Sequence, residues 1–149
     1  MPIYFYSQID EHAYLSNFSP HGFELDGVYW PTVEHYFQAQ KFAGLDHAEH
    51  IRRARTPKDA KHLGRSRAHP LRPDWETVKD DVMRRAVRRK FETHADLRER
   101  LLATGDEALI ENARHDYYWG CGADGSGLNR LGTILMEVRA VLRERDEFL

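Results

Sequence analysis

The chain has 149 residues, with 22 basic and 24 acidic side chains and a net charge of −2 when histidine is neutral. This length predicts a single domain, and the near-neutral charge argues against a general nucleic-acid coat protein, whose domain is usually strongly basic. Apolar residues at 41% and charged residues at 31% are typical of a globular protein and exclude a disordered one.

Cysteine usage and hydropathy indicate the compartment. Cys121 is the only cysteine, so an intrachain disulfide and a thiolate-rich zinc site are excluded and a reducing compartment is the simple interpretation. The first residues carry neither a basic region nor a long apolar stretch, and no segment approaches about 18 consecutive apolar residues. We therefore expect a cytoplasmic protein without a signal peptide or a membrane span.

Three short strands are predicted in the N-terminal part, at residues 3–6, 23–25 and 28–30. The second and third flank Asp26-Gly27, a strong signal for a hairpin. A helix is predicted over residues 33–43, because strong helix formers run up to a glycine stop at Gly44.

The next helix should begin at Thr56, an N-cap residue followed by proline at the first helical position, and end at Gly64. Three further helices are predicted near residues 76–91, 95–103 and 131–142. Asn129 could cap the last of them. These elements predict an α+β fold, a mostly α-helical single domain over residues 1–149 with a small strand layer.

One face of the helix over residues 33–43 carries an acid, an amide and an amine. Glu34, Gln38 and Lys41 are spaced i, i+4, i+7, which places them on one face over roughly 10 Å. Such a face is commonly solvated. Here apolar neighbours occupy most of the circumference, so we expect at least one of the three side chains to face a lined cavity.

Lys90 shares a helical stripe with Met83, Val87 and Phe91. A buried amine loses proton affinity and becomes a usable nucleophile or a partner for an acid. The commoner alternative is that the apolar stem packs while the ammonium reaches water.

The segment over residues 116–129 combines Asp116, three aromatic residues and several glycines, and it leads into the last helix. Glycines let a backbone approach a ligand, and the N–H groups at the start of a helix favour an anion. A purely structural loop would explain the glycines but not the aromatic cluster, which suits stacking on a flat ring. The nine histidines show no zinc-ligand spacing, and Cys121 lacks an identified base, so we expect no metal and an inert thiol.

Several motifs occur in a fixed order along the chain: Leu15-Ser16-Asn17-Phe18, residues 30–42, Lys90-Phe91, residues 116–122, and Asn129-Arg130-Leu131-Gly132 with Leu135-Met136. Together they resemble the NADAR family, and within it the YbiA-like N-glycosidases, over essentially the whole chain. The resemblance implies a NADAR fold and a hydrolase, without cofactor or metal, that cleaves the N-glycosidic bond between a ribose and an amino-bearing heterocycle.

The resemblance also implies substrates and site residues. In YbiA-like members the substrates are phosphorylated ribosylamino-pyrimidine intermediates of riboflavin biosynthesis, whereas other members remove ADP-ribose from guanine, including guanine in nucleic acid. The family's catalytic positions match Glu34, Lys41, Lys90 and Asp116. Substrate binding is expected from Asn17, Phe18, Gln38, Arg65, Trp75, Trp119, Gly120, Gly122 and Asn129.

Cleavage of a ribosyl C–N bond builds positive charge at the anomeric carbon and negative charge on the departing amine. We expect Glu34 on the sugar side, Asp116 on the base side, and Trp75 and Trp119 stacked on the heterocycle. A rival route uses Lys41 or Lys90 to attack a ring-opened aminal and form a Schiff base. A nucleotide or ADP-ribose binding module without turnover is the non-enzymatic alternative.

The net charge of −2 conceals a basic middle segment. Residues 51–90 contain 14 basic and 5 acidic side chains, a net of +9, so the remainder of the chain carries −11. This segment includes Trp75 and Lys90 and would attract a phosphate on the substrate. The expected partner is therefore a small phosphorylated ribosylamino-heterocycle, or an ADP-ribosylated guanine in nucleic acid.

Overall fold

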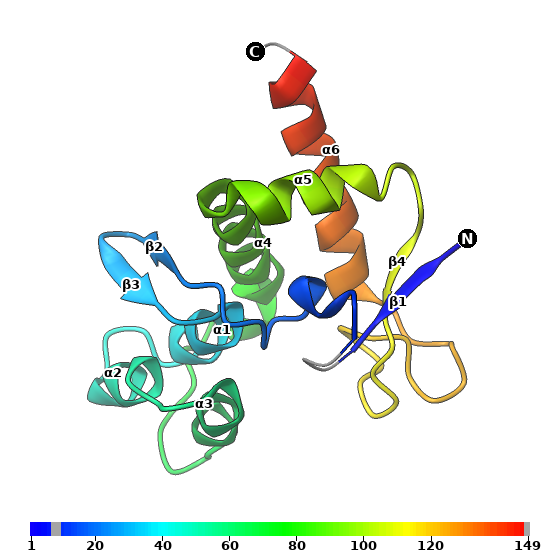
Figure 1. Cartoon of the computed structure of the whole chain (residues 1–149). Coiled ribbons are helices and arrows are strands. Elements are labelled where there is room, and N and C mark those ends of the chain that lie inside the picture. The colour runs from blue at the N-terminus through cyan, green and yellow to red at the C-terminus, as the bar shows by residue number, and fades with distance from the viewer. Residues whose placement is uncertain (7–9, 148–149) are drawn as a thin grey trace. The chain divides into compact units, whose positions relative to one another are not determined.

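The computed structural model describes residues 1–6 and 10–147. The elements in chain order are β1 (Ile3–Phe5), the 3-10 helix η1 (Ala13–Leu15), β2 (Phe23–Leu25), β3 (Val28–Trp30), α1 (Val33–Gln40), α2 (Asp46–Arg52), α3 (Pro57–Gly64), α4 (Trp75–Thr93), α5 (Ala95–Ala103), β4 (Leu109–Glu111) and α6 (Arg130–Glu147), as Figure 1 shows. The predicted α+β class, mostly helical with few strands, is confirmed. In the described ranges no helix is long and apolar enough to span a bilayer.

The chain forms two compact units. The central unit is Pro20–Lys90, and the terminal unit combines Met1–Ser19 with Phe91–Leu149. The small strand layer is likewise two separate pairs: β2 with β3 in the central unit, and β1 with β4 in the terminal unit. A single domain over residues 1–149 stays a prediction.

The hairpin of the central unit forms as predicted. β2 and β3 are antiparallel, and Leu25 pairs with Val28 across a two-residue turn. Asp26 and Gly27 have φ angles of 56° and 76°. Two successive left-handed residues define a type I′ turn, which matches the twist of the flanking strands.

Helix α1 begins as its sequence suggests but ends early. Thr32 is the N-cap, and its hydroxyl accepts the His35 N–H. The helix ends at Gln40 rather than at the predicted residue 43, because Phe42 and Leu45 donate their N–H groups in three-residue turns leading past Gly44, whose φ is 86°. The short helix α2 follows without a side-chain cap and was not predicted.

The remaining helices of the central unit agree with the sequence. Thr56 caps α3 by accepting the Asp59 N–H, and the helix ends at Gly64 as predicted. Helix α4 starts one residue earlier and ends two residues later than the predicted range of 76–91. Helix α1 packs against both α2 and α3 (Figure 1).

The terminal unit is built around β4. This strand pairs in parallel with β1, with Ile3 opposite Leu109, and α6 packs against it. The side chain of Asn129 joins the two elements: its Oδ1 accepts the Glu111 N–H at 2.9 Å and its Nδ2 donates to Leu109 O at 2.9 Å. Both side-chain groups are thereby used by β4, so the prediction that Asn129 caps the last helix is wrong.

Gly132 lets helix α6 approach this strand closely. A Cβ at this position would lie 2.0 Å from Leu109 O. Gly132→Ala should therefore destabilise the protein by about 1–3 kcal/mol, because the methyl group forces α6 away from β4. Helix propensity alone predicts the opposite sign, a gain of up to about 1 kcal/mol. Urea unfolding measures the difference, and a stabilised variant would contradict the close packing.

Candidate functional site

The central unit buries an acid and an amide on helix α1. Glu34 and Gln38 are 6% and 4% exposed, and Gln38 Nε2 donates to Glu34 Oε1 at 2.9 Å. The i, i+4 spacing places the two side chains one turn apart on the same face. The structure thus shows Glu34 and Gln38 buried rather than solvated, whereas a lined cavity beside this face stays a prediction.

Three cations act on the Glu34 carboxyl group. Burial raises its pKa, while the Gln38 hydrogen bond and the positive charges of Lys61, Lys41 and Arg65 lower it, burial being the largest cause. Lys61 and Arg65 come from helix α3 and the residue after it. The result is a carboxyl group in a positively charged surrounding that takes up a proton more readily than an exposed glutamate does.

Lys41 lies beside two aromatic rings. Its Nζ is 5.7 Å from the centroid of the Phe37 ring and 6.0 Å from that of Trp75, and it donates to Gly64 O at 3.5 Å. Burial lowers its pKa to about 8, against the opposing effect of Glu34. Lys41 therefore holds a substantial unprotonated fraction in mildly alkaline solution.

Trp75 joins this group but is buried. It is 6% exposed, and its ring meets Phe37 edge to face with centroids 5.1 Å apart. The structure therefore brings together Glu34, Gln38, Lys41, Arg65 and Trp75 of the predicted site residues. A stacking role of Trp75 toward a heterocycle stays a prediction.

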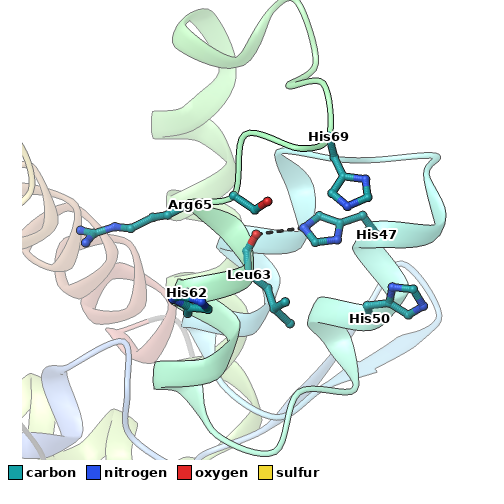
Figure 2. Close-up of a pocket in the computed structure, with 7 residues that line it drawn as sticks. His47, His50, His62, Leu63, Arg65 and His69 are labelled. Atoms are coloured by element: carbon teal, nitrogen blue, oxygen red, sulfur yellow. Dashed lines mark hydrogen bonds between the residues drawn. The ribbon is translucent and has the colours of Figure 1, made fainter.

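Arg65 separates this group from a second feature, a pocket of about 510 Å³. Figure 2 shows that the Arg65 side chain points away from His47, His50 and His69, so that its backbone faces these three residues. His47 and His69 stack there with ring centroids 3.9 Å apart, and His47 Nε2 lies 2.9 Å from Leu63 O. The pocket is lined by His47, His50, His62, Leu63, Arg65, Ser66 and His69.

Lys90 lies on helix α4 and is 2% exposed. Its ammonium does not reach water, so the commoner alternative of a snorkelling side chain is wrong. Burial lowers the pKa of Lys90 to about 7. The amine therefore meets the chemical requirement for the nucleophile that the apolar stripe suggested.

In the terminal unit, Asp116 organises the loop in which it lies. Its Oδ1 accepts the N–H groups of Tyr118 and Trp119 at 3.0 and 2.8 Å. One carboxylate oxygen is thus committed to the backbone. The Tyr118 and Trp119 rings meet edge to face with centroids 4.8 Å apart.

The glycines of this loop serve close internal packing. A Cβ at Gly120 would lie 2.8 Å from Ala113 Cβ, and one at Gly122, whose φ is 72°, would lie 2.3 Å from the Tyr117 ring. Contacts of Gly120 and Gly122 with a substrate stay predictions.

The loop also uses the N–H groups at the start of α6. Arg130 donates to Tyr118 O and Leu131 to Trp119 O. These two N–H groups are not available to an anion, so an anion site at this helix start stays a prediction that only the other N–H groups could serve.

Asn17 and Phe18 follow η1 in the terminal unit and are partly buried. Their role in binding also stays a prediction. Sequence reasoning missed Lys61 and treated Gly64 only as a helix stop. Both reach Glu34 or Gln38 from α3 through tertiary packing, for which the sequence holds no local signal. Within residues 1–6 and 10–147, no group of three or more His, Cys, Asp or Glu side chains is arranged to hold a metal ion.

Comparison with known proteins extends over nearly the whole chain. Residues 4–143 match the NADAR domain. The N-glycosidase Npun_R5314 of Nostoc punctiforme is 53% identical over 146 residues, which cover 96% of this chain and 94% of that protein. The Escherichia coli protein named N-glycosidase YbiA is 51% identical over 140 residues, 94% of this chain and 88% of that protein.

The NMR structure of E. coli YbiA matches with a TM-score of 0.89 and 50% identity, covering 97% of this chain and 86% of that one. The Vibrio vulnificus protein named riboflavin biosynthesis protein VVA0006 is 44% identical over 143 residues, which are 96% of this chain but 39% of that larger protein.

Proposed function

The chain belongs to the NADAR family, and from that premise we propose that it is an N-glycosidase that hydrolyses the C–N bond between ribose 5-phosphate and an amino-pyrimidine. Full-length relatives are named N-glycosidases, and a larger relative carries the name of a riboflavin biosynthesis protein. An early phosphorylated intermediate of riboflavin biosynthesis is therefore the substrate we favour.

The observation that carries the proposal is the buried carboxyl group of Glu34, held by Gln38 and surrounded by cations. Loss of the heterocyclic amine leaves the ribose with oxocarbenium character. A fixed carboxylate stabilises that charge, and it can take a proton from the water that attacks the anomeric carbon. A raised pKa suits Glu34 to this second task.

The position of Arg65 supports the proposal that the substrate is phosphorylated. Its guanidinium makes no hydrogen bond or ion pair with any residue in the described part of the chain, and its charge acts on both Glu34 and Lys41. Arginine binds phosphate through charge-assisted and often bidentate hydrogen bonds. Lys61, which also acts on Glu34, adds to the positive field.

We assign the heterocycle to Asp116 and Trp119 on the family resemblance. Asp116 Oδ2 accepts no hydrogen bond from a described residue, while Oδ1 is used by the loop. The free oxygen could bind or protonate the departing amine. Asn17, Phe18, Gly120, Gly122 and Asn129 are proposed to shape the surroundings of the base.

The test is a side-by-side turnover assay with a ribosylamino-pyrimidine 5-phosphate and an oligonucleotide carrying ADP-ribosyl-guanine. We expect release of free ribose 5-phosphate from the first substrate, with the higher kcat/KM. Faster release of ADP-ribose from the second would instead assign the alternative activity, which the net charge of +9 over residues 51–90 favours. Binding of both substrates without release would identify a non-catalytic binding module.

A further inference from the structure

Gly64, the last residue of α3, lies against the side chain that holds the buried carboxyl group. A Cβ at Gly64 would lie 2.0 Å from Gln38 Oε1, 2.6 Å from its Cδ and 2.8 Å from its Cβ. The φ of Gly64 is not in the left-handed region, so its backbone does not require glycine. The requirement for glycine therefore comes from the Gln38 side chain, whose amide makes the two shortest contacts.

The Gln38 amide is held at only one end. Its Nε2 donates to Glu34, while its Oε1 is buried and has no hydrogen-bond partner among the described residues. An unsatisfied buried acceptor costs about 1–3 kcal/mol. Such a cost for the fold suggests that the orientation of this amide serves another purpose, which is to direct its donor at Glu34.

We propose that Gly64 is a positioning residue: by leaving the space that the Gln38 amide occupies, it fixes the hydrogen bond that orients the Glu34 carboxyl group. The proposal rests on the proposed function in taking Glu34 as the catalytic carboxylate. Gly64 itself contacts no reacting atom, and it acts only through Gln38.

The atoms that a methyl group at Gly64 would meet indicate whether Gly64→Ala changes the position of the Gln38 amide or the fold as a whole. A methyl group at Gly64 meets Oε1 and Cδ of Gln38, which can rotate away, and also its Cβ at 2.8 Å, which can move only if α3 shifts slightly against α1. Alanine also has the higher helix propensity, by about 1 kcal/mol. Gly64→Ala should therefore keep the fold while breaking the bond from Gln38 to Glu34.

The charges that face Glu34 allow a specific readout. They are Lys41 at the end of α1, and Lys61 and Arg65 on and after α3. All three remain in a Gly64→Ala variant, whereas the Gln38 hydrogen bond, which lowers the pKa of Glu34, is lost. The expected consequence is an upward shift of the Glu34 titration.

The experiment compares Gly64→Ala, Gln38→Ala and the double variant. The titration of the ¹³C-labelled Glu34 carboxyl group in the free protein is followed by NMR, alongside the pH–rate profile and thermal unfolding. Both single variants should move the Glu34 titration and the matching limb of the profile to higher pH, with kcat lower by about 10–100-fold. The double variant should shift the Glu34 titration no further than Gln38→Ala, because the alanine at 64 then has no amide to displace, although it still meets the Cβ at position 38 and lowers stability somewhat.

Two outcomes would overturn the proposal. One is a Gly64→Ala variant that titrates like the wild type while Gln38→Ala shifts. The other is a further shift of the Glu34 titration with a further large loss of activity when Gly64→Ala is added to Gln38→Ala, which would show that Gly64 acts other than through the Gln38 amide. Wild-type protein that turns over no N-riboside would contradict the proposed function instead, and the NMR titration would still test Gly64 because it needs no substrate.

Discussion

Glu34→Gln is expected to abolish turnover while making the protein more stable. The amide cannot accept a proton from water or oppose the positive charge on the ribose, so kcat should fall by about 10²–10⁴-fold. The fold should be preserved, because glutamine has nearly the same shape and can still bond to Gln38. Steady-state release of ribose 5-phosphate measures the first effect.

The gain in stability follows from the burial of Glu34. Burial raises its pKa in the folded protein, so its contribution to stability is fully present below the unfolded pKa near 4.5 and is lost as the pH rises through the folded value. Glutamine has no such loss. The difference in Tm between Glu34→Gln and wild type should therefore grow in favour of the variant as the pH rises above about 4.5.

Thermal melts between pH 4 and 8 check this sign. Glu144→Gln, which replaces an exposed carboxylate on α6, is the matched control and should change neither turnover nor Tm. A Glu34→Gln variant less stable than wild type at pH 7.5 would show that Lys41, Lys61 and Arg65 outweigh burial.

The parts of the fold that the sequence predicts are those with local causes. The β2–β3 turn requires two successive left-handed residues, which Asp26 and Gly27 supply. Thr56 followed by proline caps α3. The hairpin and this helix therefore form where the sequence predicts them. Helix α2 has no side-chain cap and buries only His47 and Ile51, which leaves too weak a pattern for prediction.

The site divides in the same way. The i, i+4 spacing alone placed Glu34 beside Gln38, because both belong to one helix. Lys61, Arg65 and Gly64 lie near Glu34 and Gln38 because α3 packs against α1, and no local sequence pattern predicts this packing. Asn129 shows the opposite case, in which a local signal is misleading. Asparagine is a good N-cap residue, but the Asn129 side chain binds Leu109 and Glu111 of β4 instead of the helix that follows it.

Lys90→Met should also combine lost activity with increased stability. Burial lowers the pKa of Lys90 to about 7, so the unfolded chain binds its proton more tightly between that value and 10.5. Burying the neutral Lys90 amine therefore costs the folded protein no proton-binding free energy above pH 10.5. As the pH falls from 10.5 toward 7, the unfolded chain gains a proton that the folded protein does not bind, and the folded protein loses stability. Methionine removes that loss, which is roughly 3–5 kcal/mol. Urea unfolding at pH 7 and pH 10 should show a gain that is larger at pH 7.

The activity of the same variant tests the role of the amine. In the Schiff-base route, the ribosylamine opens its ring to an imine, and an unprotonated lysine adds to C1 to form an aminal. The heterocyclic amine then leaves with a proton, which gives the lysine imine, and water hydrolyses that imine to release the ribose and the lysine. Loss of that lysine should lower kcat by about 10²-fold or more. If Lys90→Met instead keeps wild-type kcat, the Lys90 amine takes no part in the reaction.

Borohydride trapping in the presence of substrate, repeated over a range of pH, distinguishes an imine on Lys90 from an imine on Lys41. The amine concentration should rise through a pH of about 7 for Lys90 and about 8 for Lys41. An adduct mapped by mass spectrometry to Lys90, formed with a midpoint near 7 and absent in Lys90→Met, would establish the imine route. The absence of an adduct on either lysine, with turnover intact, would leave Glu34 to act directly on water and the ribose.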